Sequence, residues 1–292
     1  MPVFVSAPKV VSDPKRERLN GALRRIERRW GPQTIGPASA APSVSQGLAT
    51  GFAALDQILG PTGVPLQAIT LLSGSTTCGK LTLAYKILAQ AQHTLADRGH
   101  SIAILDLGAS ADADYLDRCG IDLNAALVVR PSSGQAAVRV LLDLVCRGGV
   151  TPPFLPVTPP SRSQGGATPP LQRAILVDGV PDLMVDANTA RAFDQIMPQV
   201  NLALKGTGSA LIMLDEVQPP WLPALAGWTS RAMAHYAALH IELVREGWLE
   251  SGGELVGYRA QARIVKRRGP GHGRSAPIAI EFGETVRARE TW

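Results

Sequence analysis

The chain has 292 residues, a formal net charge of +5, 45% hydrophobic residues and 5% aromatic residues. The apolar share is large enough for a buried core, but no apolar run approaches the roughly 20 residues that span a bilayer, so we expect no membrane association and a cytoplasmic location. The three cysteines are scattered without metal-ligand spacing. Such a sparse, odd set fits a reducing cytoplasm better than a disulfide scaffold.

The first predicted element is a basic amphipathic helix. Residues 13–30 carry seven Lys or Arg against three acids, and Gly31 and Pro32 follow. Apolar side chains recur at helical spacing on one face, at Leu19, Leu23, Ile26 and Trp30. We therefore expect an N-terminal helical arm over residues 1–35. Small residues and prolines over residues 36–47 predict a linker behind it.

The remaining residues, 48–292, are predicted to form one α/β core. Short apolar runs without alternation lie at 68–73, 101–106, 125–129, 173–178 and 209–214. Helical patterns separate them at 80–97, 136–147 and 189–206. This succession predicts a mostly parallel central sheet with helices on both faces. Closely spaced apolar runs beyond residue 236 predict antiparallel strands at the C-terminal end of the sheet.

One stretch inside the core is predicted to be a surface insertion. Residues 151–170 hold seven prolines and two glycines. Proline removes a backbone donor and ends helices, so this stretch fits neither a helix nor a central strand.

The stretch SGSTTCGKLTL, residues 73–83, has the pattern of a phosphate-binding loop. Gly74 is followed by four residues and then by Gly79 and Lys80, between a predicted strand and a predicted helix. Backbone N–H groups and the helix dipole at such a place attract phosphate. We expect a bound nucleotide to contact Gly74, Ser75, Thr76, Thr77, Cys78, Gly79, Lys80, Leu81 and Thr82.

The position after the loop lysine departs from the usual pattern. A Ser or Thr hydroxyl normally holds Mg²⁺ there, but this chain has Leu81, and the hydroxyl comes one place later at Thr82. The run AILVD ends at Asp178, where a nucleotidase needs an acid that orders the metal and its water. Thr82 and Asp178 are therefore the candidate Mg²⁺ ligands.

Several stretches together resemble the RecA recombinase core. They are GLATGFAALDQILGPTGVPLQAITLLSGSTTCGKLTL, AILDLGASADADYLDRCGIDLNAALVVRPSSGQAAV and QARIVKRRGPG, while RERLNGALRRIERRWGPQTIG is similar to the N-terminal helix of bacterial RecA. The likeness spans residues 15–285. It implies a RecA-like phosphate-loop core that binds ATP, with a DNA-dependent ATPase fold. The small C-terminal domain of bacterial RecA has no counterpart here, so we expect no separate C-terminal domain.

The resemblance also implies roles for residues outside the loop. Asp112 and Tyr115 fall where the family has an adenine-contacting acid and a stacking tyrosine. Lys266 and Arg268 fall where two lysines reach the nucleotide of the adjacent subunit.

Positions tied to hydrolysis differ from the family. Gly108 replaces the glutamate that polarises water, and Glu216 replaces a glutamine that senses the γ-phosphate. With Leu81, these departures predict weak or absent hydrolysis, and we assign no catalytic residue.

Two loops correspond to the DNA-contacting loops of the family. Residues 179–190 carry no Lys or Arg, while residues 216–231 carry Trp221, Trp228 and Arg231. Tryptophans stack on the bases of single-stranded DNA, but they also anchor protein partners. Attraction of DNA phosphates would then come from the basic run at 263–274, which includes Arg267, or from the N-terminal arm.

Three functions stay open at this point. The first is a RecA-like repair or recombination protein that binds ATP and single-stranded DNA and self-associates through its arm. The second is an inactive RecA-derived adaptor, similar to the ImuA proteins that accompany a translesion polymerase in the SOS response to DNA damage. The third is a working ATPase motor on DNA, which Gly108 disfavours.

Overall fold

A computed structural model describes residues 14–30, 47–95, 102–146, 174–217, 233–268, 271–283 and 287–289. The chain divides into two compact units, Met1–Val44 and Ser45–Trp292. Their boundary falls inside the predicted linker, most of which lies outside the described residues, as does the predicted insertion at 151–170.

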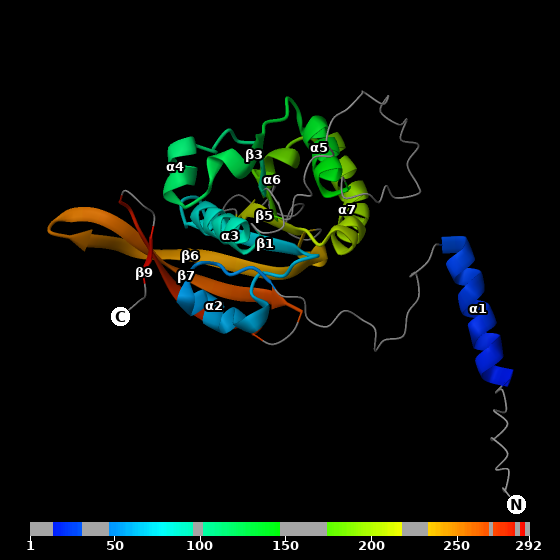
Figure 1. The fold of residues 1–292 in the computed structure, drawn as a ribbon. Helices are drawn as coiled ribbons and strands as arrows, with labels where there is room; N and C mark the ends of the chain where they lie inside the picture. Colours follow the sequence, from blue (N-terminus) through cyan, green and yellow to red (C-terminus); the bar gives the residue numbers. More distant parts are fainter. Residues whose placement is uncertain are drawn as a thin grey trace, which may run out of the picture. The chain divides into compact units, whose positions relative to one another are not determined.

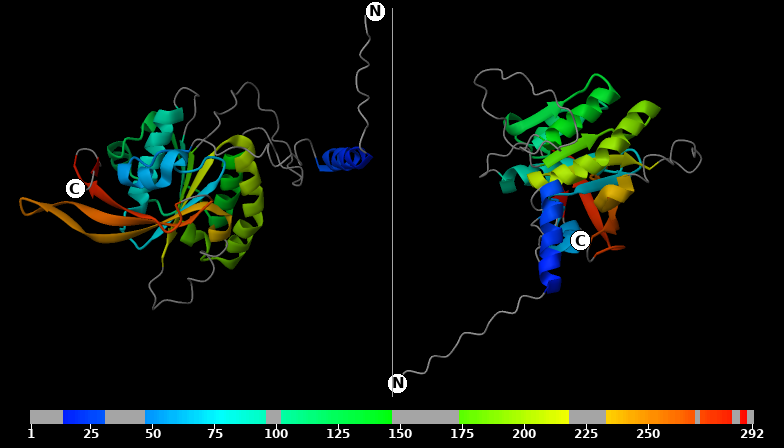
Figure 2. Two further views of the ribbon diagram at one scale, coloured as in Figure 1. Left: turned by 90° about the horizontal axis from the view of Figure 1, so that it is seen from below. Right: turned by 90° about the vertical axis from the view of Figure 1, so that its right-hand side faces the viewer.

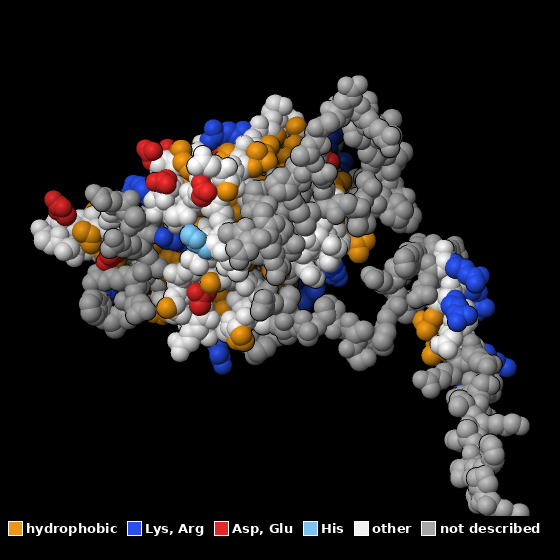
Figure 3. All heavy atoms as spheres, viewed as in Figure 1, with side chains coloured by type: hydrophobic (Ala, Val, Ile, Leu, Met, Phe, Trp, Pro, Cys, Tyr) orange, Lys and Arg blue, Asp and Glu red, His pale blue; other side chains and the backbone are white. Residues whose placement is uncertain are grey.

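The first unit contains helix α1, Pro14–Trp30. Its basic side chains that the structure describes are exposed, at Lys15, Arg18, Arg24, Arg25 and Arg28. Figure 3 shows the blue Lys and Arg side chains gathered along one side of this helix and orange apolar ones along another. Leu19, on the apolar stripe, is 58% exposed.

The second unit is built on one mixed sheet (Figure 1). Within the described residues it has nine strands in the order β3-β2-β4-β5-β1-β6-β7-β8-β9. The bounds are β1 Ile69–Gly74, β2 Ile102–Asp106, β3 Ala126–Val129, β4 Ala174–Asp178, β5 Ala210–Glu216, β6 Ala237–Ser251, β7 Glu254–Arg267, β8 Ser275–Glu281 and β9 Arg287–Arg289. Pairs up to β1–β6 are parallel, and the pairs from β6 to β9 are antiparallel. The predicted α/β class with antiparallel C-terminal strands is confirmed.

Helices cover the two faces of the sheet with separate cores. Side chains of α2, α3 and α4 belong to one buried cluster, and side chains of α5, α6 and α7 belong to the other. The bounds are α2 Ala53–Leu59, α3 Lys80–Leu95, α4 Ala113–Arg118, α5 Gly134–Cys146, α6 Val180–Leu183 and α7 Ala187–Thr207, with short 3-10 turns at Gly60–Thr62 and Leu123–Ala125. No helix in the described part of the chain is both long and apolar enough to cross a membrane.

Strand β3 differs from the prediction that every parallel strand is covered on both faces. Leu127 is 42% exposed and Val128 is 37% exposed. The reason is its place in the sheet, because β3 is the edge strand and pairs with β2. Periodicity identifies a strand but does not say where in a sheet it lies.

Parallel pairing brings the carboxyl ends of four strands together. Asp106 at the end of β2 is in register with Asp178 at the end of β4. In the same way, Gly74 at the end of β1 is in register with Glu216 at the end of β5. Open α/β sheets bind ligands at this edge, and the phosphate loop begins there.

Candidate functional site

The loop between β1 and α3 has the backbone of an anion-binding turn. Gly79 has a φ of +96°, which favours glycine, and Thr77 also lies in the left-handed region with a φ of 59°. A Cβ on Gly79 would lie 2.7 Å from the Tyr258 hydroxyl, and one on Gly74 would lie 2.5 Å from the Cys78 sulfur. Both glycines are therefore required by close approach, and the loop can direct its N–H groups towards a phosphate.

Lys80 is folded back over this loop. Its Nζ donates to the backbone oxygen of Ser75 at 3.0 Å and of Gly74 at 3.4 Å. Both acceptors are neutral carbonyls of the loop itself. A phosphate group would replace them with charged oxygens, which make hydrogen bonds about twice as strong. The donor set fits the phosphates of a nucleotide.

Glu216 lies against the same loop. The Thr76 hydroxyl donates to its Oε1, so the acid predicted at the γ-phosphate end contacts the loop directly. A carboxylate in this place repels phosphate oxygens. The geometry therefore opposes close approach of a triphosphate, unless cations offset the negative charge.

Thr82, a predicted Mg²⁺ ligand, is buried and directed towards two tyrosines. Its Oγ1 lies 2.5 Å from the Tyr115 hydroxyl and 3.4 Å from the Tyr258 hydroxyl, and the residue is 3% exposed. Leu81 packs against the core on the same face. Thr82 still lines the pocket described below, so its metal role stays a prediction.

Thr82→Val separates the packing role from the metal role. We expect the free energy of unfolding to fall by about 1–2 kcal/mol, because both tyrosine hydroxyls lose a partner. If the hydroxyl serves packing, the Mg²⁺ dependence of ATP binding will not change. Denaturant unfolding and nucleotide titration with and without Mg²⁺ measure both quantities. The control is Thr94→Val at an exposed position of α3, and loss of the Mg²⁺ dependence in the Thr82 variant alone would assign Thr82 to the metal.

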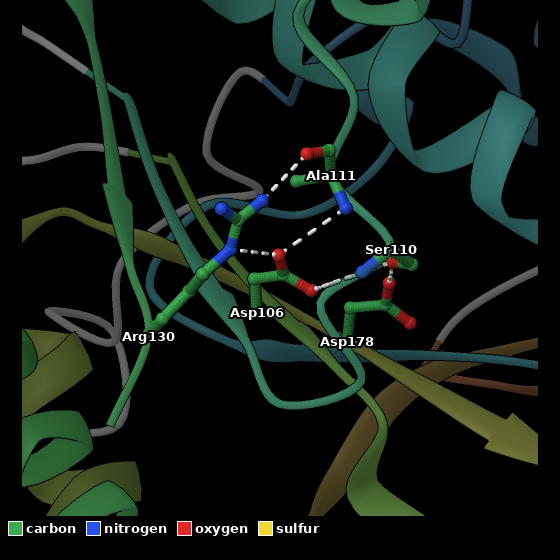
Figure 4. Close-up of polar contacts among 5 residues, drawn as sticks. All are labelled: Asp106, Ser110, Ala111, Arg130 and Asp178. Carbon is green, nitrogen blue, oxygen red and sulfur yellow. Dashed lines mark hydrogen bonds and ion pairs between the residues drawn. The ribbon is translucent and has the colours of Figure 1, made fainter. Parts of the chain in front are cut away.

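A polar network joins the ends of β2, β3 and β4 (Figure 4). Arg130 Nε forms an ion pair with Asp106 Oδ2 at 2.8 Å, and its Nη2 donates to the Ala111 oxygen at 2.7 Å. Asp106 also accepts from the backbone N–H groups of Ser110 at 2.9 Å and Ala111 at 3.2 Å. The Ser110 hydroxyl donates to Asp178. The loop after β2 is thus fixed beside the predicted second-motif acid.

The two aspartates of this network have opposite pKa shifts. Burial by itself raises the pKa of Asp106, but the hydrogen bonds from Arg130 and from the backbone of Ser110 and Ala111 outweigh it and hold the pKa below its ordinary value. Burial raises the pKa of Asp178, and the Ser110 hydrogen bond and Lys80 offset only part of that shift. Asp106 is therefore a fixed structural charge, whereas Asp178 gains its full charge more readily beside a bound cation.

These elements enclose a pocket of about 540 Å³. Loop and α3 residues line one part of it, namely Thr76, Thr77, Gly79, Lys80, Leu81 and Thr82. Strand ends and the loops behind them add Ser110, Asp178, Asp182, Asp215 and Glu216, and aromatic residues add Tyr115, Trp248, Tyr258 and Phe282. Most of the residues predicted to contact the nucleotide thus lie around one cavity.

Position 108 lies in the loop after β2 and has open space around it. The nearest side-chain atom to a Cβ built on Gly108 is Asp182 Oδ2, at 3.9 Å. No side chain at residue 108 is available to hold a water molecule. Residue 108 therefore supplies no carboxylate to the space beside Asp182.

Three predicted site residues, Asp112, Lys266 and Arg268, lie outside the pocket lining. Asp112 caps α4 by accepting from the Tyr115 backbone N–H at 2.9 Å. Lys266 Nζ donates to the backbone oxygens of Ala234 and His235. Arg268 is exposed. Their roles towards a nucleotide of this or an adjacent subunit stay predictions.

Arg267, predicted to contact DNA, is used inside the fold. Its guanidinium donates to the backbone oxygens of Ile58 and Leu59 and to the Thr62 hydroxyl, at the end of α2. The other predicted DNA-contacting residues, Trp221, Trp228 and Arg231, lie outside the described residues.

Several pocket residues escaped the sequence analysis because they come from distant strands. Asp106, which fixes the loop that carries the pocket residue Ser110, was missed as well, although it ends a predicted apolar run just as Asp178 does. Arg245, Trp248 and Tyr258 lie on the β6–β7 hairpin, and no motif links them to the loop. Figures 1 and 2 show this hairpin projecting beyond the helices that cover the sheet.

Comparison with known proteins shows which proteins the chain is similar to. Residues 17–152 match the family model of the RecA N-terminal domain. The chain is 26% identical to Protein RecA of Chlorobium chlorochromatii over 98% of this chain and 79% of that protein. It is 27% identical to Protein RecA of Chlorobaculum tepidum, over 96% of this chain and 78% of the relative. These likenesses support a divergent member of the RecA family.

The likeness to RecA proteins extends beyond the matched domain. Protein RecA of Aquifex aeolicus is 26% identical over 93% of this chain and 76% of its own length. Such coverage includes strand β6 and strand β7, which supply Arg245, Trp248 and Tyr258 to the pocket lining. The RecA resemblance expected from the sequence is confirmed.

Proposed function

We propose that this RecA-like protein binds ATP at the β1–α3 loop and acts on single-stranded DNA in recombination or repair, with little or no hydrolysis. Likeness to RecA proteins supports the recombination and repair role. The observation that supports ATP binding is the glycine loop with Lys80 folded over it. The Lys80 ammonium donates to two neutral loop carbonyls, and the phosphate oxygens of ATP would replace these acceptors.

The donors for Mg²⁺ are less complete than those for phosphate. Leu81 has an apolar side chain where the Mg²⁺-binding hydroxyl is usually found, and the Thr82 hydroxyl contacts a tyrosine hydroxyl instead. Asp178 is the carboxylate placed to hold a metal, although a serine hydroxyl already donates to it. Bound Mg²⁺ would neutralise phosphate charge. We expect ATP binding to depend only modestly on Mg²⁺.

Weak hydrolysis follows from the residues around the phosphate end. Gly108 offers no carboxylate, and Glu216 is bonded to Thr76. Losing a general base lowers turnover by roughly 10²–10⁴-fold. ATP then acts as a bound structural ligand, as in a protein that assembles on DNA without active disassembly.

Self-association through the arm is part of the proposal. The apolar stripe of α1 has Leu19 exposed within its own unit, and its basic side chains are exposed as well. Such a helix can dock on a second copy of the chain or lie along a polyanion.

A RecA-derived adaptor is the second candidate function. Large apolar side chains are exposed on the β6–β7 hairpin, with Val244 at 54%, Trp248 at 51% and Leu255 at 57%. Exposed apolar residues on one projecting element suit a protein partner such as a translesion polymerase. In that case binding of single-stranded DNA is dispensable.

Three measurements on the full chain test these functions. We expect a fluorescent ATP analogue to bind, labelled single-stranded DNA to bind more tightly with ATP present, and steady-state turnover to stay near the uncatalysed level. Absence of DNA binding at low salt with ATP binding intact would favour the adaptor. Rapid DNA-stimulated turnover would overturn the proposed loss of hydrolysis, and absence of ATP binding would overturn the proposal itself.

A further inference from the structure

The charge of the pocket calls for more than one cation. Among the described residues that line it, the charged side chains are four carboxylates, at Asp178, Asp182, Asp215 and Glu216, and two cations, at Lys80 and Arg245. A nucleotide polyphosphate adds further negative charge to this surface. If Lys80 were the one cation, the carboxylates would outnumber it four to one. A second cation therefore reduces the repulsion that a triphosphate meets in the pocket.

Arg245 reaches the phosphate loop from the hairpin. Its Nη1 donates to the Thr77 hydroxyl at 3.3 Å, and Thr77 is the loop residue in the left-handed conformation. The guanidinium thus lies beside the turn whose N–H groups form the anion cradle. Arginine presents a planar set of donors that matches phosphate oxygens, and it keeps its charge.

Trp248 holds that guanidinium in place. The Arg245 Cζ lies 4.7 Å from the Trp248 ring centroid, which is cation–π geometry. Residues three apart in a regular strand point to opposite faces. Here the β6–β7 ladder is irregular between Arg245 and Gly247, and one extra residue in a strand puts both side chains on one face.

Tyr258 anchors the tryptophan to the loop. Trp248 is its cross-strand partner, with the ring centroids 6.3 Å apart at an interplanar angle of 83°. The Tyr258 hydroxyl in turn lies 2.7 Å from where a Cβ on Gly79 would be. A chain of contacts therefore runs from the loop glycine through Tyr258 and Trp248 to Arg245.

We propose that Arg245 is a second phosphate-binding cation of this pocket, supplied by the same subunit, and that Trp248 is its positioning residue. The proposal rests on nucleotide binding at the β1–α3 loop. On binding, the guanidinium exchanges the neutral Thr77 hydroxyl for charged phosphate oxygens. The residue therefore favours polyphosphates and contributes little to the binding of adenosine.

The test is competition of ATP, ADP and adenosine against a fluorescent ATP analogue bound to the full chain. Arg245→Ala is expected to weaken ATP about 10- to 100-fold and adenosine not at all. Arg259→Ala is the matched control, because it removes an equal charge from an exposed position on β7 that is not in the pocket lining. Equal affinities in these two variants would overturn the proposal.

The role of Trp248 is tested by a double-mutant cycle. Trp248→Leu is expected to weaken ATP about threefold to tenfold in the parent chain and to have no further effect when Arg245 is already alanine. Trp248→Phe keeps a ring face and restores part of the affinity. Additive losses in the cycle would remove Trp248 from the proposal. Failure of the parent chain to bind the fluorescent analogue would instead overturn the proposed ATP binding itself.

Discussion

Arg130→Ala is expected to lower the free energy of unfolding by about 2 kcal/mol, because it leaves a buried carboxylate without its cation. The Asp106 side chain is 0% exposed and the Arg130 side chain 54% exposed. Breaking a fully buried pair costs roughly 3–5 kcal/mol, and the exposed arginine places this pair below that range. Two backbone N–H groups, from Ser110 and Ala111, remain as partners of the carboxylate.

The same variant is expected to change how stability depends on pH. The folded-state pKa of Asp106 lies below its ordinary value of 3.8. Its stabilising contribution is therefore complete above that value and is lost as the pH falls through the folded-state pKa. The stability difference between parent and variant should be largest near neutrality and shrink towards about pH 3.

Denaturant unfolding at both pH values measures these effects. Arg139→Ala, at an exposed position of α5, removes the same charge and is expected to change stability by less than about 0.5 kcal/mol. A pH-independent difference between parent and Arg130→Ala would show that the ion pair with Asp106 is not its source. We also expect weaker nucleotide binding in the Arg130 variant, since Ser110 of the loop after β2 lines the pocket.

Lys80→Ala is expected to weaken ATP about 100-fold or more while leaving stability nearly unchanged. Within the described structure, the Lys80 ammonium donates hydrogen bonds only to neutral acceptors, the backbone oxygens of Gly74 and Ser75. Their loss costs little folding free energy because the loop oxygens can bind water instead. Charged hydrogen bonds to two phosphates, in contrast, amount to about 3 kcal/mol.

Equilibrium titration with the fluorescent ATP analogue and thermal unfolding without nucleotide distinguish the two effects. Lys205→Ala on α7, an exposed lysine far from the pocket lining, is the charge-matched control. ATP should raise the unfolding temperature of the parent and of the control but not of Lys80→Ala. Equal ATP affinity in all three proteins would show that the loop does not hold the phosphates.

Local pattern was sufficient for the elements and for the loop. Non-alternating apolar runs at β1, β2, β4 and β5 indicated buried parallel strands, because such strands are covered on both faces. The spacing of Gly74, Gly79 and Lys80 indicated the anion cradle, because close backbone approach needs glycine there. The short helices α2 and α6 were not predicted, since their seven and four residues are too few to show a helical period.

What the sequence by itself determined is the RecA-like class and the phosphate loop, since both depend on residues adjacent in the chain. The tertiary structure alone decided which side chains surround that loop. Strand pairing placed Asp106 with Arg130 and Glu216 with Thr76, and an irregular hairpin register placed Arg245 and Trp248 over it. These contacts join residues 24 to 168 positions apart, and a sequence carries no local signal of such pairings because they follow from sheet order and register.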